Sequence, residues 1–270
     1  MTAPRLHYDI HESDLPDAPA LLLVHGMYSA RSHWLLNLAG LRQFTRPVVI
    51  ELLGHGRSPS PTDDASYHPD SYVQAFESIR QAVGADRWLL CGQSLGGALT
   101  LRYALSHPER VIAQAFTNSN SAMADAEWGE QLRARITAEI QQHGSGDQAS
   151  IANNPLNPAN NQRLPPHLRA AFAADVELHE PEGLARTSLN TLGNSSLSER
   201  LSELLVPTLL VVGTRERRFE PGRKIAEERI PRLEVVELDA GHGVNLDRPE
   251  EFNAALRRFF ERVMAEQPRT

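Results

Sequence analysis

Residues 88–97 of the chain read WLLCGQSLGG, and this segment has the pattern of a strand, a tight turn and a helix. The apolar run that ends at Cys91 is typical of a buried strand, and the small and apolar residues after Ser94 predict a helix. Gly92 and Gly96 stand two residues before and two residues after Ser94. Only very small residues fit a strand-to-helix turn that is so tight, and such a turn exposes a serine hydroxyl at a helix N-terminus. The stretch therefore predicts Ser94 as a nucleophile; the alternative is a glycine-rich turn with an incidental serine.

The segments on both sides of this stretch alternate between short apolar runs and helical patterns, which is typical of a parallel α/β sheet. An exposed strand is expected at Leu6–Ile10, and buried strands are expected at Ala20–Val24, Val48–Leu53, Trp88–Cys91, Val111–Phe116, Thr208–Val212 and Val235–Leu238. Helices are expected at Ser71–Val83, Gly97–Ser106, Pro221–Ile230 and Pro249–Val263. The sequence thus predicts an α/β fold with a mostly parallel, doubly wound sheet.

The alternation stops between residues 119 and 205. This part of the chain holds a helical pattern at Ala124–Gln142, an Asn- and Pro-rich passage at Asn153–Asn161, and further apolar residues at helical spacing. Nothing in it has the pattern of a strand. We therefore expect a helical insertion at residues 119–205 that sits on a core formed by residues 1–118 and 206–270.

The composition excludes several classes of protein. A net charge of −7 argues against a nucleic-acid partner, because a protein that holds phosphates needs a basic face. Cys91 is the only cysteine and Lys224 the only lysine, which excludes an internal disulfide, a cysteine metal site and a GK[ST] phosphate loop. No apolar run is long enough for a membrane span or a signal peptide, so we expect a cytoplasmic protein without a membrane partner.

A His-Gly turn follows the strand predicted at Ala20–Val24. Acyl transfer needs donors that point at the oxyanion of a tetrahedral intermediate. We expect one donor to be the amide of Leu95, directly after the serine, and the other to be the amide of Met27, just past His25–Gly26. The alternative for His25–Gly26 is a plain turn.

A second glycine-flanked histidine, His242, follows the last predicted strand. It stands at the carboxyl end of a strand, where the catalytic groups of open α/β sheets gather, and it is the predicted general base. An acid that orients its imidazole is expected after the strand Thr208–Val212. Glu216 is the first candidate, Glu220 the second and Asp125 a distant third, while a solvated, Arg-flanked turn is the alternative for this segment.

The motifs formed by these residues resemble those of the α/β-hydrolase superfamily, in the branch that carries a helical cap inserted after the sixth strand. The resemblance rests on the serine turn at 92–97, the turn at 25–26, the segment LGHGRS at 53–58 and the histidine loop at 241–242. It covers nearly the whole chain outside the cap and implies a triad in the order Ser94…Glu216…His242. Relatives with this pattern include carboxylesterases, carbon–carbon bond hydrolases, lactonases, thioesterases and the menaquinone-pathway lyase.

The resemblance implies a serine hydrolase that cleaves a small-molecule substrate, namely a carboxylic ester, lactone or thioester, through an acyl-enzyme and without a metal ion or cofactor. A carbon–carbon bond hydrolase or lyase that acts on a dienone-like acid is one alternative, with Arg186 as a candidate clamp for the acid. A non-catalytic protein that binds a small ligand is the other. Candidate substrate-binding residues are His25, Trp34, Met123 and Trp128; the substrate itself and the oligomeric state stay open.

Overall fold

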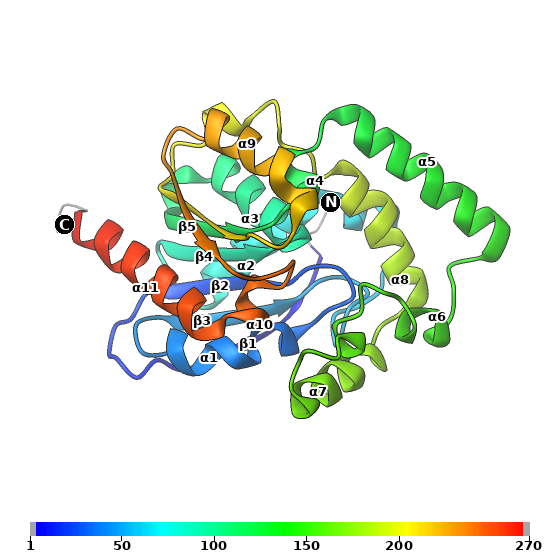
Figure 1. Ribbon diagram of the computed structural model, residues 1–270, viewed down its shortest axis with the longest axis horizontal. Coiled ribbons are helices and arrows are strands. Elements are labelled where there is room, and N and C mark those ends of the chain that lie inside the picture. Colours follow the sequence, from blue (N-terminus) through cyan, green and yellow to red (C-terminus); the bar gives the residue numbers. More distant parts are fainter. Residues whose placement is uncertain (1–3, 267–270) are drawn as a thin grey trace.

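The computed structural model describes residues 4–266, which form one sheet with helices on both faces (Figure 1). The strands are β1 His7–Ile10, β2 Ala20–Val24, β3 Arg46–Glu51, β4 Trp88–Gln93, β5 Val111–Thr117, β6 Thr208–Gly213 and β7 Leu233–Leu238. Their order in the sheet is β1-β3-β2-β4-β5-β6-β7. β1 runs antiparallel to β3, and all other neighbours are parallel, as predicted.

Helices cover the sheet in two layers. The core helices are α1 Leu35–Leu41, α2 Pro69–Ala82, α3 Leu95–Ser106, α9 Glu220–Arg229, α10 Val244–Asp247 and α11 Pro249–Glu266. Side chains of α2, α3 and α9 pack on one face, and side chains of α1 and α11 pack on the other. In β2, Leu22 and Val24 join the first layer while Leu21 and Leu23 join the second, which is why the strand is apolar without a break.

The far edge of the sheet differs from the expectation. Val235–Leu238 was expected to be a buried strand, but the residues of β7 are half-buried or exposed. β7 pairs with β6 alone, so its side chains are less covered than those of interior strands. The prediction of a buried strand was therefore wrong at this edge.

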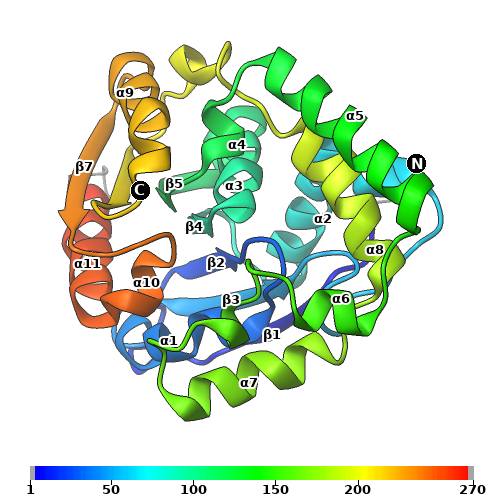
Figure 2. The same cartoon turned by 45° about the vertical axis from the view of Figure 1, so that its right-hand side comes forward.

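Between β5 and β6 the chain is helical. This segment contains α4 Asn120–Met123, α5 Ala126–His143, α6 Gln148–Ala152, α7 Pro166–Val176 and α8 Pro181–Arg186, joined by loops and short 3-10 and π turns. Figure 2 shows α5, α8, α6 and α7 in an arc to one side of the sheet. Five strands of the described chain precede the segment and two follow it. Within residues 4–266, no helix is long and apolar enough to cross a bilayer.

Part of the helical segment belongs to the core by its packing. Leu197, Leu201 and Leu204 are buried in the same apolar cluster as α2 and α3. The portion that stands clear of the core therefore ends before Leu197.

The lone cysteine lies in the central strand β4. Cys91 is fully buried, and burial raises the pKa of its thiol. A thiol in this state behaves as a small apolar side chain.

Candidate active site

Ser94 lies in a tight turn between β4 and α3. Its backbone angles are φ 52° and ψ −117°, a conformation that a residue with a side chain rarely adopts. The turn brings chains so close that a Cβ at Gly92 would lie 2.2 Å from the Gly96 oxygen, and one at Gly96 would lie 2.1 Å from the Val24 oxygen. Both glycines are thus required by the approach of neighbouring backbone, as the sequence predicted.

His242 and Glu216 meet at the carboxyl ends of β7 and β6. His242 Nδ1 lies 2.9 Å from Glu216 Oε2 and donates a hydrogen bond to it. The histidine is half-exposed, whereas the carboxylate is largely covered. The other two candidate acids lie elsewhere: Asp125 caps α5 by accepting from the Trp128 amide, and Glu220 begins α9.

Two asparagines hold the acid in place. Asn118 Nδ2 donates to Glu216 Oε2 at 2.5 Å, and Asn120 Nδ2 donates to Oε1 at 3.4 Å. Asn118 Oδ1 also accepts from the Gly213 amide at 3.2 Å, so one side chain ties the acid to the end of β6. From the sequence, the polar stretch directly after β5 fits amides that face the pocket or cap a helix, with a cap favoured; its contact with the acid was not predicted.

Further contacts position the histidine loop. Asp247 accepts from the Gly241 amide at 2.7 Å, and Gln93 donates to the His242 carbonyl at 3.3 Å. Arg215 pairs with Asp247 at 3.0 Å and not with its neighbour Glu216. Arg215 therefore acts on the histidine loop, and the acid receives its hydrogen bonds from His242 and two asparagine amides.

A cavity of about 460 Å³ opens above these groups. Ser94, His242 and Met27 line it together with Ser29 and His33 from the loop after β2. Leu95 is the first residue of α3, so its amide is among those that have no acceptor within the helix. The structure thus brings Ser94, His242 and Met27 to one cavity, with the Leu95 amide next to the serine.

The roof of the cavity comes from the loop between α6 and α7. Its lining residues are Pro155, Leu156, Asn157, Pro158, Asn160, Asn161, Arg163 and Leu164. The Asn- and Pro-rich composition of this loop predicts no site residue, because loop composition does not show which way a loop folds.

The four predicted substrate-binding residues do not line this cavity. His25 is fully buried; its Nδ1 donates to the Gly26 carbonyl at 2.7 Å and its Nε2 accepts from the Leu52 amide at 3.0 Å. Trp34 is buried on the other side of the turn, next to Phe252.

Met123 and Trp128 line a separate cavity that α9 closes. The predicted substrate contacts of His25, Trp34, Met123 and Trp128 are therefore corrected. His25 braces the loop after β2 and Trp34 packs in the core. The other two lie on α4 and α5, away from the Ser94 cavity.

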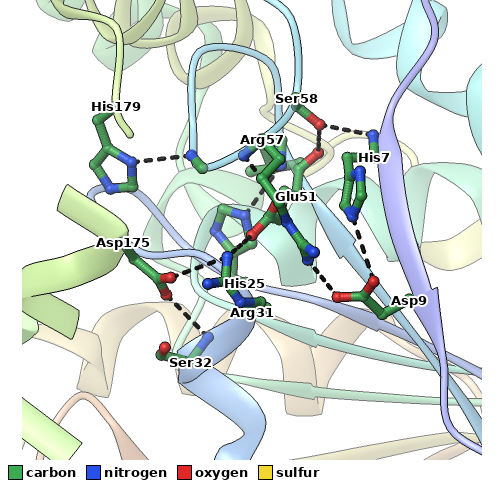
Figure 3. A network of polar contacts seen from close by, with 12 residues as sticks. His7, Asp9, His25, Arg31, Ser32, Glu51, Arg57, Ser58, Asp175 and His179 are labelled. Carbon is green, nitrogen blue, oxygen red and sulfur yellow. Dashed lines mark hydrogen bonds and ion pairs between the residues drawn. The ribbon is translucent and has the colours of Figure 1, made fainter. Parts of the chain in front are cut away.

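A buried polar network joins the helical segment to the core (Figure 3). Arg31 Nη1 lies 3.1 Å from Glu51 at the end of β3 and 3.2 Å from Asp175 on α7. Asp175 also accepts from the Ser32 amide at 3.1 Å. Burial raises the pKa of Asp175; burial would raise that of Glu51 too, but hydrogen bonds and charge from Arg57 lower it. The network fixes α7 above the loop that carries His33.

Four histidines near the site are buried and neutral. Burial lowers the pKa of His25 to about 4, of His33 to about 3 and of His179 to about 4, and it lowers that of His55 well below its usual value. His33 donates from Nε2 to Asn245 and accepts from Ser29 at Nδ1, both at 3.1 Å. Of these four rings, only His33 lines the cavity, and its two hydrogen bonds brace the cavity wall.

Comparison with known proteins identifies the family. The Alpha/beta hydrolase family pattern matches residues 21–255. The sequence is 29% identical to a proposed carbamate hydrolase, RutD, of Rhizobium rhizogenes, over 94% of this chain and 97% of that protein. It is 26% identical to a proposed 2-succinyl-6-hydroxy-2,4-cyclohexadiene-1-carboxylate synthase of Bacillus subtilis, over 96% of each.

Solved structures show the same architecture. The enol-lactonase from Burkholderia xenovorans LB400 is similar with a TM-score of 0.79 at 22% identity, over 95% of this chain and 96% of that one. MenH from S. aureus is similar with a TM-score of 0.81 at 19% identity, over 96% and 99%. With the family match spanning most of its length, the chain belongs to the alpha/beta hydrolase family.

Proposed function

We propose that the protein is a serine hydrolase that cleaves small carboxylic esters, lactones or thioesters through Ser94, His242 and Glu216. The observation that carries the proposal is the 2.9 Å contact between His242 Nδ1 and Glu216 Oε2 beside a cavity that Ser94 lines. A proton held on Nδ1 leaves Nε2 free to accept one from the serine hydroxyl.

The reaction then follows the chemistry of an activated serine. Ser94 Oγ attacks the carbonyl carbon while His242 Nε2 takes its proton, and the amides of Met27 and Leu95 stabilise the oxyanion. His242 returns the proton to the leaving group, and an acyl-enzyme remains on Ser94. Water, deprotonated by His242, releases the acid and restores the hydroxyl.

The names of similar proteins are consistent with this proposal and also define its competitor. A carbamate hydrolase and an enol-lactonase are hydrolases of acyl compounds, whereas the synthase name of the Bacillus subtilis relative favours a lyase as second candidate. Arg186, the clamp expected for a lyase substrate, pairs with Asp64 and Glu182 and lies outside the cavity. We therefore rank ester cleavage first.

Labelling by a fluorophosphonate, followed by mass mapping of the adduct, tests the nucleophile and its base together. We expect an adduct on Ser94, none in Ser94→Ala, and strongly slowed labelling in His242→Ala. Ser78→Ala, on an exposed face of α2, is the control and should label normally. An adduct on another serine would contradict the assignment.

Turnover separates the candidate functions. On 4-nitrophenyl acetate, we expect Ser94→Ala to lower kcat/KM by about 10⁴-fold, since the nucleophile of such a triad contributes at least that much. Rapid turnover of a dienone-like acid with negligible esterase activity would favour the lyase. Tight binding of a ligand without any product would favour the non-catalytic binding protein.

A further inference from the structure

The cavity at Ser94 is lined by one cationic and one anionic side chain, and they differ in their protein partners. Among the described residues that line it, Arg163 is the only arginine or lysine and Asp247 the only carboxylate. Asp247 is already occupied by Arg215 and by the Gly241 amide. In a protein with a net charge of −7, the cavity at the reaction centre thus presents one positive group.

Other polar side chains of the cavity are engaged by protein partners. Ser29 and His33 bond to each other and on to Asn245, and Gln93 donates to the His242 carbonyl. In the roof, Asn157 and Asn160 both donate to the Ala152 carbonyl, so their amide groups shape the loop.

The guanidinium of Arg163 differs from these groups. It is exposed, and among residues 4–266 no carboxylate pairs with it and no acceptor takes a hydrogen bond from it. Arg186, by contrast, is paired with Asp64 and Glu182, and Arg31 is paired with Glu51 and Asp175.

The backbone at Arg163 is held on both sides. The Arg163 amide donates to Asn161 Oδ1 at 3.0 Å. The next residue, Leu164, is buried in an apolar cluster with Leu168, Phe172 and Leu246. Leu246 also lines the cavity beside the histidine loop, so this cluster keeps the roof in register with His242.

We propose that the substrate carries a carboxylate and that Arg163 binds it, which makes Arg163 a specificity-determining residue. The proposal rests on the proposed ester cleavage at Ser94. A guanidinium presents a planar fork of donors that matches a carboxylate, and an anchored backbone reduces the ordering that binding requires. The cavity then orients an acidic ester by its charge and cleaves it at its carbonyl.

Pairs of substrates with matched shape measure this preference. Mono(4-nitrophenyl) glutarate and 4-nitrophenyl valerate differ by a carboxylate on the acyl part. 3-Acetoxybenzoate and 3-methylphenyl acetate differ by a carboxylate on the leaving group. The measured quantity is the ratio of kcat/KM for the acidic member to that for the neutral member of each pair, at pH 7.5.

We expect Arg163→Gln to lower this ratio about tenfold or more for one pair, because hydrogen bonds to charged groups contribute this much. Arg163→Lys should recover part of the loss, Arg163→Glu should lower the ratio further, and salt should weaken the preference of the wild type. Arg169→Gln is the control, since Arg169 lies on α7 and lines a neighbouring cavity. The affected pair shows which side of the scissile bond the carboxylate occupies.

Two results overturn the proposal. One is a kcat/KM ratio that Arg163→Gln leaves unchanged for both pairs. The other is an equal loss of the ratio in Arg163→Gln and Arg169→Gln, which would show that any nearby positive charge attracts the acidic substrate equally well. Failure of the proposed ester cleavage looks different, because the wild type would then turn over none of the four esters. Calorimetric binding of monomethyl glutarate to Ser94→Ala, with and without Arg163→Gln, tests Arg163 independently of turnover.

Discussion

The carboxylate of Glu216 receives contacts from three side chains, two from the segment after β5 and one from the loop after β7. His242 and Asn118 reach Oε2, and Asn120 reaches Oε1. An amide that donates to a carboxylate oxygen holds that carboxylate in one orientation. Asn118 is thus a positioning residue for the proposed triad.

Exchanging the amide of Asn118 for a carboxylate tests this role. We expect Asn118→Asp to lower kcat about tenfold or more, because two adjacent carboxylates cannot both ionise easily, and to move the acidic limb of the pH–rate profile to higher pH. Asn120→Asp, whose contact is longer, should have the smaller effect. A wild-type pH profile in Asn118→Asp would contradict the role.

Residues of the site differed in how well the sequence predicted them. Ser94 and His242 could be predicted because flanking glycines mark tight turns at strand ends. Asn118 and Asn120 could not, because asparagines after a strand fit a helix cap equally well. Here the cap residue of α4, Ser119, makes no capping bond with its side chain. The roof residue Arg163 had no local signal, because its role depends on where the α6–α7 loop folds.

At the scale of elements, the loop after β2 carries both His33 and the anchor of α7. Arg31 lies between two buried carboxylates, Glu51 on β3 and Asp175 on α7. Removing the cation from such an arrangement leaves buried charge without compensation. We therefore expect this arginine to join the helical segment to the core.

Substitutions of Arg31 and Asp175 measure this link. Because Arg31 is partly exposed, we expect Arg31→Ala to lower the free energy of unfolding by about 2 kcal/mol. The double variant with Asp175→Asn should be less destabilised, since asparagine leaves no charge to compensate and can still accept from the Ser32 amide. Urea unfolding of the two single variants and the double variant checks this; strictly additive losses would show that the two residues do not interact.

The elements themselves were predictable to different degrees. The interior strands β2 to β6 are covered on both faces, so their apolar runs are continuous and easy to locate. β7 has the same apolar character at Val235 and Val236 but lies at an edge, and a single sequence does not show the order of strands. The helical segment was recognised by its lack of strands, while its arrangement over Ser94 depends on long-range packing.

For the whole molecule, buried histidines make stability depend on pH. The pKa values of His25, His33 and His179 are lowered to about 4, 3 and 4, whereas an unfolded histidine titrates near ~6.5. Between these values the unfolded chain binds more protons than the folded protein, so the free energy of unfolding falls as the pH falls. The pKa of Asp175 is raised, so between its ordinary and its raised pKa the folded protein binds the extra proton. In that range Asp175 opposes the loss of stability as the pH falls.

We expect the urea midpoint to be constant above about pH 7 and to fall steeply from pH 6.5 to 4. Each buried histidine contributes up to ~1.4 kcal/mol per pH unit in this window. His33→Asn should reduce the slope, whereas His143→Gln, at the exposed end of α5, should not. Equal midpoints at pH 7.5 and pH 5 would contradict the argument.

Because Cys91 is buried, we expect the folded protein not to react with thiol reagents. Alkylation requires β4 to open, so a brief pulse of iodoacetamide counts the molecules whose central strand has separated from its neighbours. For the same reason, a cysteine introduced on the exposed surface of α7 would be labelled with a spin label or fluorophore while Cys91 stays unlabelled. Movements of the roof during turnover could then be followed without first removing the natural sulfur.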